Sequence, residues 1–414
     1  MDYFQAFGIL ISLSAAFGYI NHRFLRLPTT IGLMLIALFL SLLLIVLGIF
    51  DPELVQPISR ALSEIDFSQV LMEVMLSFLL FAGALHVDVT ALHQQRWPVL
   101  IFATLGVVAS TFMVGTGFYF LLQWVGFPID YIYCLLFGSL ISPTDPIAVL
   151  SILHKAHVPK ELEVKITGES LFNDGVAVVV FLTLLEIAQL GAGEVGAGEI
   201  ATLFAQEALG GGLFGLALGY GGYLLLKSID AYVVEVLITL AMVTGGYLLA
   251  QQLHLSGPLA VVVMGLVMSQ QGRKFAMSDE TRDYVDLFWE MIDEVLNAVL
   301  FVLIGLEVLV LEFHREYFLI GAAAIVIVLL ARLISVGLPI SLMSLRRDFV
   351  PYTITILTWG GLRGGISVAL ALSLPGDMPR ELIVAVTYLV VIFSIVVQGL
   401  SIEPLVRRLK VGTG

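Results

Sequence analysis

Three short stretches combine ionisable residues with helix-breaking residues inside long apolar runs. They are SPTDP at residues 142–146, GESLFNDG at residues 168–175 and GGLRGG at residues 360–365. A charged side chain within hydrocarbon costs about 2.5 to 3.5 kcal/mol even on the mildest scale, so ionisable residues deep in an apolar run indicate a functional site. Together the three stretches predict a buried site of carboxylates, hydroxyls and one arginine.

The first stretch predicts an opened helix beside a carboxylate. Pro143 and Pro146 remove two backbone donors and disfavour helix at the residues before them. The helix should open around Asp145, which frees carbonyl oxygens next to its carboxylate. Oxygen ligands of both kinds suit a small hard cation. A proline kink with a structural Asp145 is the alternative, but a kink needs no aspartate.

The second and third stretches supply opposite charges. Glu169 and Asn173 are four residues apart and share a helix face, whereas Asp174 lies about 140° round from Glu169. The two acids should therefore serve different partners, one binding an ion and the other being neutralised. Arg363 is the expected neutralising group, because a buried arginine needs a carboxylate and its flanking glycines let backbones approach closely.

The composition predicts that the segments which position these residues span a membrane. With 59% hydrophobic and 13% charged residues in 414, the chain has more apolar surface than a soluble core can bury. The first apolar run lacks a basic leader and an A-x-A cleavage pattern, so it is predicted to be a retained span. The net charge of −13 identifies no partner, and without a basic patch we expect no nucleic-acid role. No histidine pair has metal-ligand spacing, and we expect no cofactor.

At about 20 apolar residues per crossing, the sequence predicts thirteen spans. They are approximately residues 3–21, 28–49, 67–87, 97–124, 129–153, 164–190, 199–227, 231–252, 255–271, 287–310, 317–344, 350–374 and 381–405. With the N-terminus outside and the C-terminus cytoplasmic, fifteen of the twenty Lys and Arg residues fall on the cytoplasmic side. Only Arg60, Arg315 and Arg380 fall outside, which agrees with the positive-inside rule.

The odd span number predicts an all-α polytopic membrane protein with two inverted six-helix repeats in one transporter domain, residues 1–414. The first repeat covers about 3–190, the seventh span at about 199–227 is a linker, and the second repeat covers about 231–405. SPTDP and GGLRGG then occupy corresponding fifth positions, in spans 5 and 12. Such a pair of discontinuous helices is typical of a transporter binding site at the bilayer midplane.

Four stretches resemble the monovalent cation/proton antiporters, specifically NhaP-type sodium/proton exchangers. They are SPTDPIAVLSIL, GESLFNDGVAVVVF, FVLIGLE at Phe301–Glu307 and WGGLRGGISVALALSLP. The resemblance implies that Asp174 exchanges the ion and the proton, that Asn173 marks an electroneutral member, and that Glu169 pairs with Arg363. It also implies that Thr144, Asp145 and Ser170 complete the cation site. A homodimer, an elevator-like movement and a plasma (inner) membrane location follow from the same resemblance.

Other polar residues within spans carry weaker predictions. Glu73, Glu235, Glu290, Asp293, Glu294 and Arg332 either line a cytoplasmic funnel or form structural pairs, Arg332 with an acid of the tenth span. Structural pairing or snorkelling is the preferred interpretation. The exception is the WEMIDE segment at residues 289–294, which lies near the inner face and could attract cations.

The resulting expectation is an antiporter that exchanges sodium or lithium for protons, not an enzyme. Cation and proton compete for Asp174, and lipid surrounds the spans. A potassium/proton exchanger is the alternative, because ion choice depends on cavity size and coordination number. An intramembrane aspartyl protease using Asp145 and Asp174 lacks the GxGD context. A channel fits less well, because titratable acids with a compensating arginine suit alternating exchange better than a carbonyl-lined filter.

Overall fold

The regular secondary structure of the residues that the computed structural model describes is helical. These are residues 3–51, 53, 56, 75–146, 149–150, 153, 158–190, 197–272, 276–311, 314–409 and 411. Within them the only extended pairing is one isolated bridge between Asp145 and Leu362. The predicted all-α class is therefore confirmed, while Glu73 lies outside the described residues.

Each of the thirteen predicted apolar stretches overlaps a described helix. The first six overlap α1 (Tyr3–Ile20), α2 (Thr29–Phe50), α5 (Leu76–Leu85), α7 (Arg96–Ile101) with α8 (Val107–Val125), α9 (Tyr131–Leu140) and α11 (Lys160–Leu190). The others overlap α12 (Ala197–Lys227), α13 (Tyr232–Gln252), α14 (Gly257–Val267), α16 (Asp279–Glu307), α17 (Arg315–Met343), α18 (Thr353–Trp359) with α19 (Gly365–Leu372), and α20 (Arg380–Phe393) with α21 (Gly399–Leu409). A short helix, α6 (Val89–Gln94), follows α5.

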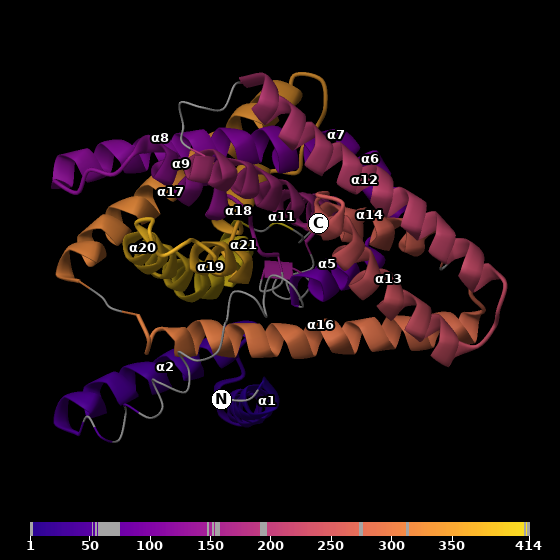
Figure 1. The fold of residues 1–414 in the computed structure, drawn as a ribbon, viewed down its shortest axis with the longest axis horizontal. Helices are drawn as coiled ribbons and strands as arrows, with labels where there is room; N and C mark the ends of the chain where they lie inside the picture. Colours follow the sequence, from indigo (N-terminus) through magenta and orange to yellow (C-terminus); the bar gives the residue numbers. More distant parts are fainter. Residues whose placement is uncertain are drawn as a thin grey trace.

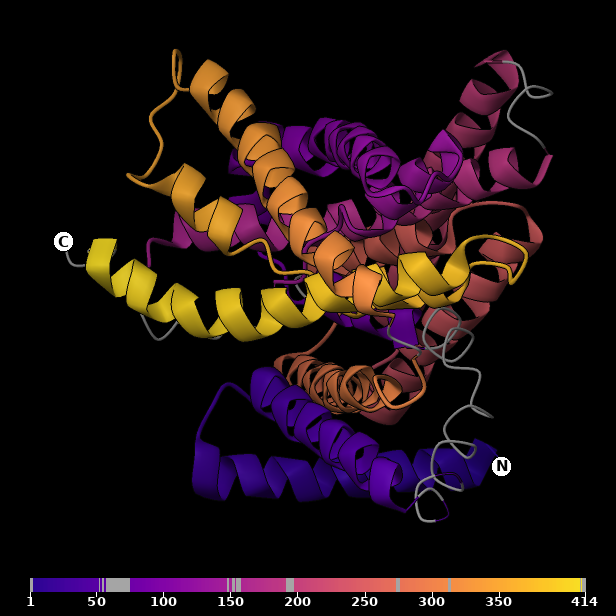
Figure 2. The same ribbon diagram turned by 90° about the vertical axis from the view of Figure 1, so that its left-hand side faces the viewer.

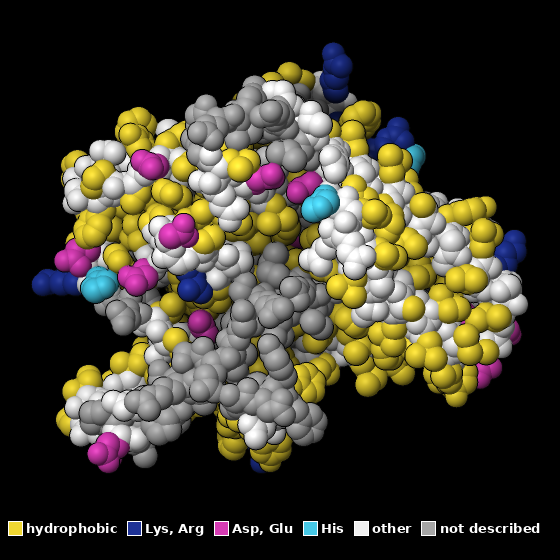
Figure 3. Space-filling model, in the orientation of Figure 1, with side chains coloured by type: hydrophobic (Ala, Val, Ile, Leu, Met, Phe, Trp, Pro, Cys, Tyr) yellow, Lys and Arg dark blue, Asp and Glu magenta, His cyan; other side chains and the backbone are white. Residues whose placement is uncertain are grey.

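Seven of the described helical segments are long and apolar enough to cross a membrane. They are Thr29–Phe50, Arg96–Val125, Lys160–Leu190, Phe204–Lys227, Tyr232–Gln252, Arg315–Met343 and Arg380–Leu409. Their outward faces keep large apolar side chains exposed, with Trp124 at 85% and Phe50 at 81%. Figure 3 shows hydrophobic side chains over much of the visible surface. Apolar surface on this scale indicates contact with lipid.

Helix α16 lies between two groups of helices. In Figure 1 it runs along the length of the molecule, with α1 and α2 on one side and the remaining helices on the other. Figure 2 shows the same separation from the side. Helix α16 contacts α2, α5, α13 and α19, so it joins the α1–α2 pair to the centre of the fold.

Two interrupted helices cross at that centre. Helix α9 ends at Leu140, and residues 141–146 leave the helical conformation. Helix α18 ends at Trp359 and α19 begins at Gly365. The Asp145 N–H donates to the Leu362 carbonyl at 2.8 Å, so the two openings lie against each other. The discontinuities predicted from proline and glycine in spans 5 and 12 are confirmed.

Helix α16 extends about two helical turns before the span predicted at residues 287–310. It begins at Asp279. Ser278 is its N-cap and accepts the Thr281 N–H at 3.3 Å, while Asp230 accepts hydrogen bonds from the hydroxyls of both residues at 2.8 and 3.1 Å. The polar first turns are thus stabilised by capping, which an apolar window does not detect.

Candidate cation site at the crossing of two interrupted helices

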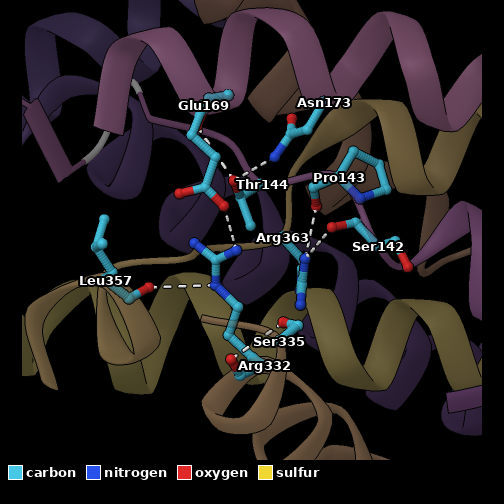
Figure 4. A network of polar contacts seen from close by, with 10 residues as sticks. Ser142, Pro143, Thr144, Glu169, Asn173, Arg332, Ser335, Leu357 and Arg363 are labelled. Atoms are coloured by element: carbon cyan, nitrogen blue, oxygen red, sulfur yellow. Dashed lines mark hydrogen bonds and ion pairs between the residues drawn. The ribbon is translucent and has the colours of Figure 1, made fainter. Parts of the chain in front are cut away.

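A buried arginine donates hydrogen bonds to the backbone carbonyls at the opening after α9. Pro146 has no N–H, so the Ser142 carbonyl lacks its helical donor four residues ahead. The Nη1 atom of Arg363 donates to this carbonyl at 2.6 Å and to the Pro143 carbonyl at 2.9 Å (Figure 4). Arg363 is 2% exposed. Its guanidinium therefore replaces the donors that the proline-rich opening lacks, and it places a positive charge there.

Two polar side chains of the last span form hydrogen bonds with the backbone at the opening between α18 and α19. The Arg363 N–H donates to Ser394 Oγ at 2.9 Å, and Gln398 Nε2 donates to the Trp359 carbonyl at 2.9 Å. Ser394 and Gln398 begin and end a π-helical segment between α20 and α21, a distortion that often occurs at functional sites. These two residues were missed by sequence reasoning, although polar side chains four apart in an apolar span were a usable signal.

A cluster of hydroxyls and one amide joins the first opening to α11. Thr144 Oγ1 lies 3.1 Å from Ser170 Oγ. It also accepts a hydrogen bond from Asn173 Nδ2 at 2.8 Å (Figure 4). All three side chains are at most 2% exposed. Because Asn173 occupies one lone pair of Thr144 Oγ1, the Thr144 hydrogen remains available to Ser170. Asn173 thus positions Thr144.

Four predicted cation ligands line one cavity of about 460 Å³. They are Thr144, Asp145, Ser170 and Asp174. Asn173 is not among the described residues that line this cavity. Two carboxylates and two hydroxyls are hard oxygen ligands, which can replace water around a small cation. The same carboxylates can bind a proton, so the cavity is able to hold either species.

The predicted Glu169–Arg363 ion pair is wrong. Glu169 pairs with Nη1 of Arg332 in α17, and Nε of Arg332 donates to the Leu357 carbonyl at 3.2 Å (Figure 4). The prediction that Arg332 pairs with an acid of the tenth span is wrong for the same reason. Arg363 donates instead to the Ser142 and Pro143 carbonyls, and Arg332 neutralises Glu169.

The acids of α16 line the same cavity as Asp174. Glu290, Asp293 and Glu294 lie there with Asn297 and His86. Their spacing of three or four residues places them on one face of the helix. Glu235 has a different role, because its Oε1 accepts the N–H of Ala231 at 3.3 Å at the start of its own helix. Of the two alternatives for these acids, the structure favours the lining of a cavity for Glu290, Asp293 and Glu294, and their attraction of cations stays a prediction.

Comparison with known proteins identifies the family. The family model described as "Sodium/hydrogen exchanger, transmembrane" matches residues 11–408. The chain belongs to the sodium/hydrogen exchanger family. Among curated members, it is 52% identical to the Na(+)/H(+) antiporter NhaP of Pseudomonas aeruginosa over 413 residues, covering 97% of this chain and 96% of that one. It is 35% identical to the Na(+)/H(+) antiporter NhaH of Halobacillus dabanensis, covering 94% and 93%.

A solved exchanger structure has the same fold. The sodium proton antiporter MjNhaP1 of Methanocaldococcus jannaschii superposes with a TM-score of 0.77 at 19% identity, covering 99% of each chain. The NhaP-type resemblance found in the sequence is therefore confirmed. The sodium/hydrogen exchanger family consists of transporters, so the expectation of a transporter in place of an enzyme agrees with the family.

Proposed function

We propose that this exchanger moves sodium or lithium ions in one direction and protons in the other, with both competing for Asp174. The observation that carries the proposal is the convergence of Asp174, Asp145, Thr144 and Ser170 on one cavity where the two interrupted helices cross. Burial disfavours an empty charged carboxylate, and a bound proton or cation removes that cost. Only the loaded forms then cross the hydrophobic barrier.

The charges around the crossing support an electroneutral exchange. The core around the crossing contains the cations Arg332 and Arg363 and the anions Glu169, Asp145 and Asp174. With every group ionised their sum is −1, and binding one proton or one monovalent cation brings it to zero. If Asp145 stays ionised throughout, both half-cycles move a neutral core, and the membrane potential has no net charge to act on.

The membrane arrangement is part of the same proposal. We infer thirteen crossings, an outside N-terminus, a cytoplasmic C-terminus and a plasma-membrane location. The two inverted repeats are residues 3–190 and 231–405, joined by the linker span at 199–227 in one transporter domain. The segregation of Lys and Arg supports this orientation, and bacterial relatives support the location. We further propose that the protein functions as a homodimer in lipid, without a cofactor or a nucleic-acid partner.

Purified protein in liposomes with an internal pH dye tests which cation is exchanged for protons. We expect inward gradients of sodium or lithium to drive proton efflux, and gradients of potassium or choline to drive none. Asp174→Asn should abolish the flux, while Asp283→Asn, at an exposed acid on α16, should preserve it. Proton flux driven by potassium would favour the potassium/proton alternative, and normal exchange by Asp174→Asn would exclude Asp174 as the shared site.

The electroneutral stoichiometry is tested by clamping the membrane potential with potassium and valinomycin, once potassium is shown not to be transported. Sodium-driven proton flux should be equal at zero and at about 100 mV. That potential would bias the transfer of one net charge by about 2.3 kcal/mol. A flux that depends steeply on potential would mean that Asp145 also exchanges protons, and the one-to-one stoichiometry would be wrong.

A further inference from the structure

Two buried polar oxygens in the cavity have no hydrogen-bond partner among the described residues. They are Oδ1 of Asn297 in α16 and Oγ of Ser367 in α19, while the Asn297 amide group faces the Asp293 carboxylate. Asn297 is 2% exposed and Ser367 is 1% exposed, and both line the cavity that contains Asp174. Buried polar groups in proteins are nearly always hydrogen-bonded, so two unpartnered ones in one cavity indicate a ligand.

The packing of α16 against α19 brings these residues into one region. A Cβ atom added at Gly365 would lie 2.6 Å from Leu300 Cδ2, and one added at Gly364 would lie 2.3 Å from Asp145 Oδ2. Leu300 is one turn after Asn297, and Ser367 follows Gly365 in the first turn of α19. The start of α19 is therefore in contact with both Asp145 and the Asn297 region of α16.

The polar face of α16 changes character with depth. Glu290 is exposed, Asp293 is partly buried and Asn297 is buried, at spacings of three and four residues. Carboxylates attract a cation at the shallow end, whereas an amide oxygen at the deep end can bind it without adding a charge. An aspartate at position 297 would have added a negative charge to the buried core.

We propose that Asn297, Ser367 and Asp293 form a second subsite for a monovalent cation, in the same cavity as Asp174. Its ligands are the Asn297 Oδ1, the Ser367 Oγ and the Asp293 carboxylate. A sodium ion held there keeps part of its hydration shell and passes on to Asp174 when the proton leaves. Only this transfer step rests on the proposed function, because cation binding at the subsite does not require transport.

Binding is tested by thermal unfolding of purified protein, with sodium replacing choline at constant ionic strength. The test background is Asp174→Asn with Thr144→Val, which removes two ligands of the first site. We expect this variant still to be stabilised by sodium, and we expect added Asn297→Leu and Ser367→Ala to abolish the shift. A background that does not respond to sodium, or one that responds equally after the added changes, would show that Asn297 and Ser367 do not bind sodium and would overturn the subsite.

The apparent KM for sodium of a single variant tests the subsite independently, including the case in which the multiple variants do not fold. Ser367→Ala should raise the apparent KM for sodium about tenfold, the factor that corresponds to one lost oxygen ligand worth about 1.4 kcal/mol, with kcat little changed. Ser373→Ala is the matched control, because its hydroxyl bonds the Leu370 carbonyl. Equal KM values in the two variants would overturn the subsite. Absence of any sodium/proton exchange in the unaltered protein would instead refute the proposed function and leave the binding test valid.

Discussion

Gly364 tests whether the contact between the two openings sets the cation site. Its backbone at φ −131° and ψ −154° is extended, so alanine is conformationally allowed there. Space is the constraint, because a Cβ at position 364 would lie 2.3 Å from Oδ2, 2.6 Å from Cβ and 2.8 Å from Cγ of Asp145. Real Cβ contacts essentially never fall below 3.0 Å, so either Asp145 or the backbone at position 364 must move by at least about 0.7 Å.

The cost of Gly364→Ala appears in one of two quantities. Overpacking a close contact costs about 1 to 3 kcal/mol. If Asp145 keeps its place, the free energy of unfolding falls by that amount. If Asp145 moves, sodium binding weakens, and the same energy corresponds to about a fivefold to 150-fold rise in the apparent KM for sodium. Gly376→Ala is the matched control, because nothing lies within 4 Å of its added Cβ.

The assay combines melting temperature with sodium-driven proton flux in liposomes. An Asp145→Gly background removes the three atoms nearest to the new Cβ, so the stability cost of Gly364→Ala should largely disappear there. Such a double-mutant cycle isolates the coupling between the two positions. If Gly364→Ala matches Gly376→Ala in both stability and KM, the openings do not control Asp145 and the reasoning fails.

Two further predictions concern ion pairs. Arg332→Ala should leave Glu169 buried without its partner and lower the free energy of unfolding by about 3 to 5 kcal/mol. The double change with Glu169→Ala should recover part of this loss. Simple additivity of the melting-temperature losses of the two single variants would refute the pairing. Asp88 is the N-cap of α6, and hydrogen bonds from the N–H groups of Ala91 and Thr90, together with Lys160, lower its pKa below 3.8. Asp88→Ala should therefore destabilise the protein by about 1 kcal/mol at neutral pH, and the difference from the unaltered protein should disappear as pH falls below about 4; an equal difference at pH 3 would contradict this origin.

The sequence was sufficient for the order of the apolar helices and for the two interruptions. Apolar length determined the spans, because lipid requires each backbone group to be bonded within its own helix. The breaks followed from local chemistry, since Pro146 removes a donor at a fixed distance from the Ser142 carbonyl whatever surrounds it. Cavity-lining acids were also predictable, because charges in apolar helices have few other places to lie.

The arginine partners could not be predicted in this way. Arg332 and Arg363 both lie in apolar spans, and either could neutralise an acid of α11 by charge alone. The choice depends on how α17 and the α18–α19 opening are rotated about α11, which no pattern within a single span records. Asn297 and Ser367 were missed for a similar reason, because one amide and one hydroxyl in apolar helices resemble ordinary packing residues until their surroundings are known.

The corrected pairing changes the location of positive charge but not its total. With Glu169 neutralised by Arg332, the second guanidinium is held at the Ser142 and Pro143 carbonyls, directly before Thr144 and Asp145 in the chain. One side chain therefore satisfies the opened backbone and offsets the charge of the site. Loss of Arg363 should remove both effects together, whereas loss of Arg332 removes neutralisation of Glu169 and leaves the donors to the first opening in place. The two arginines are thus not interchangeable, although they contribute equally to the electroneutral count.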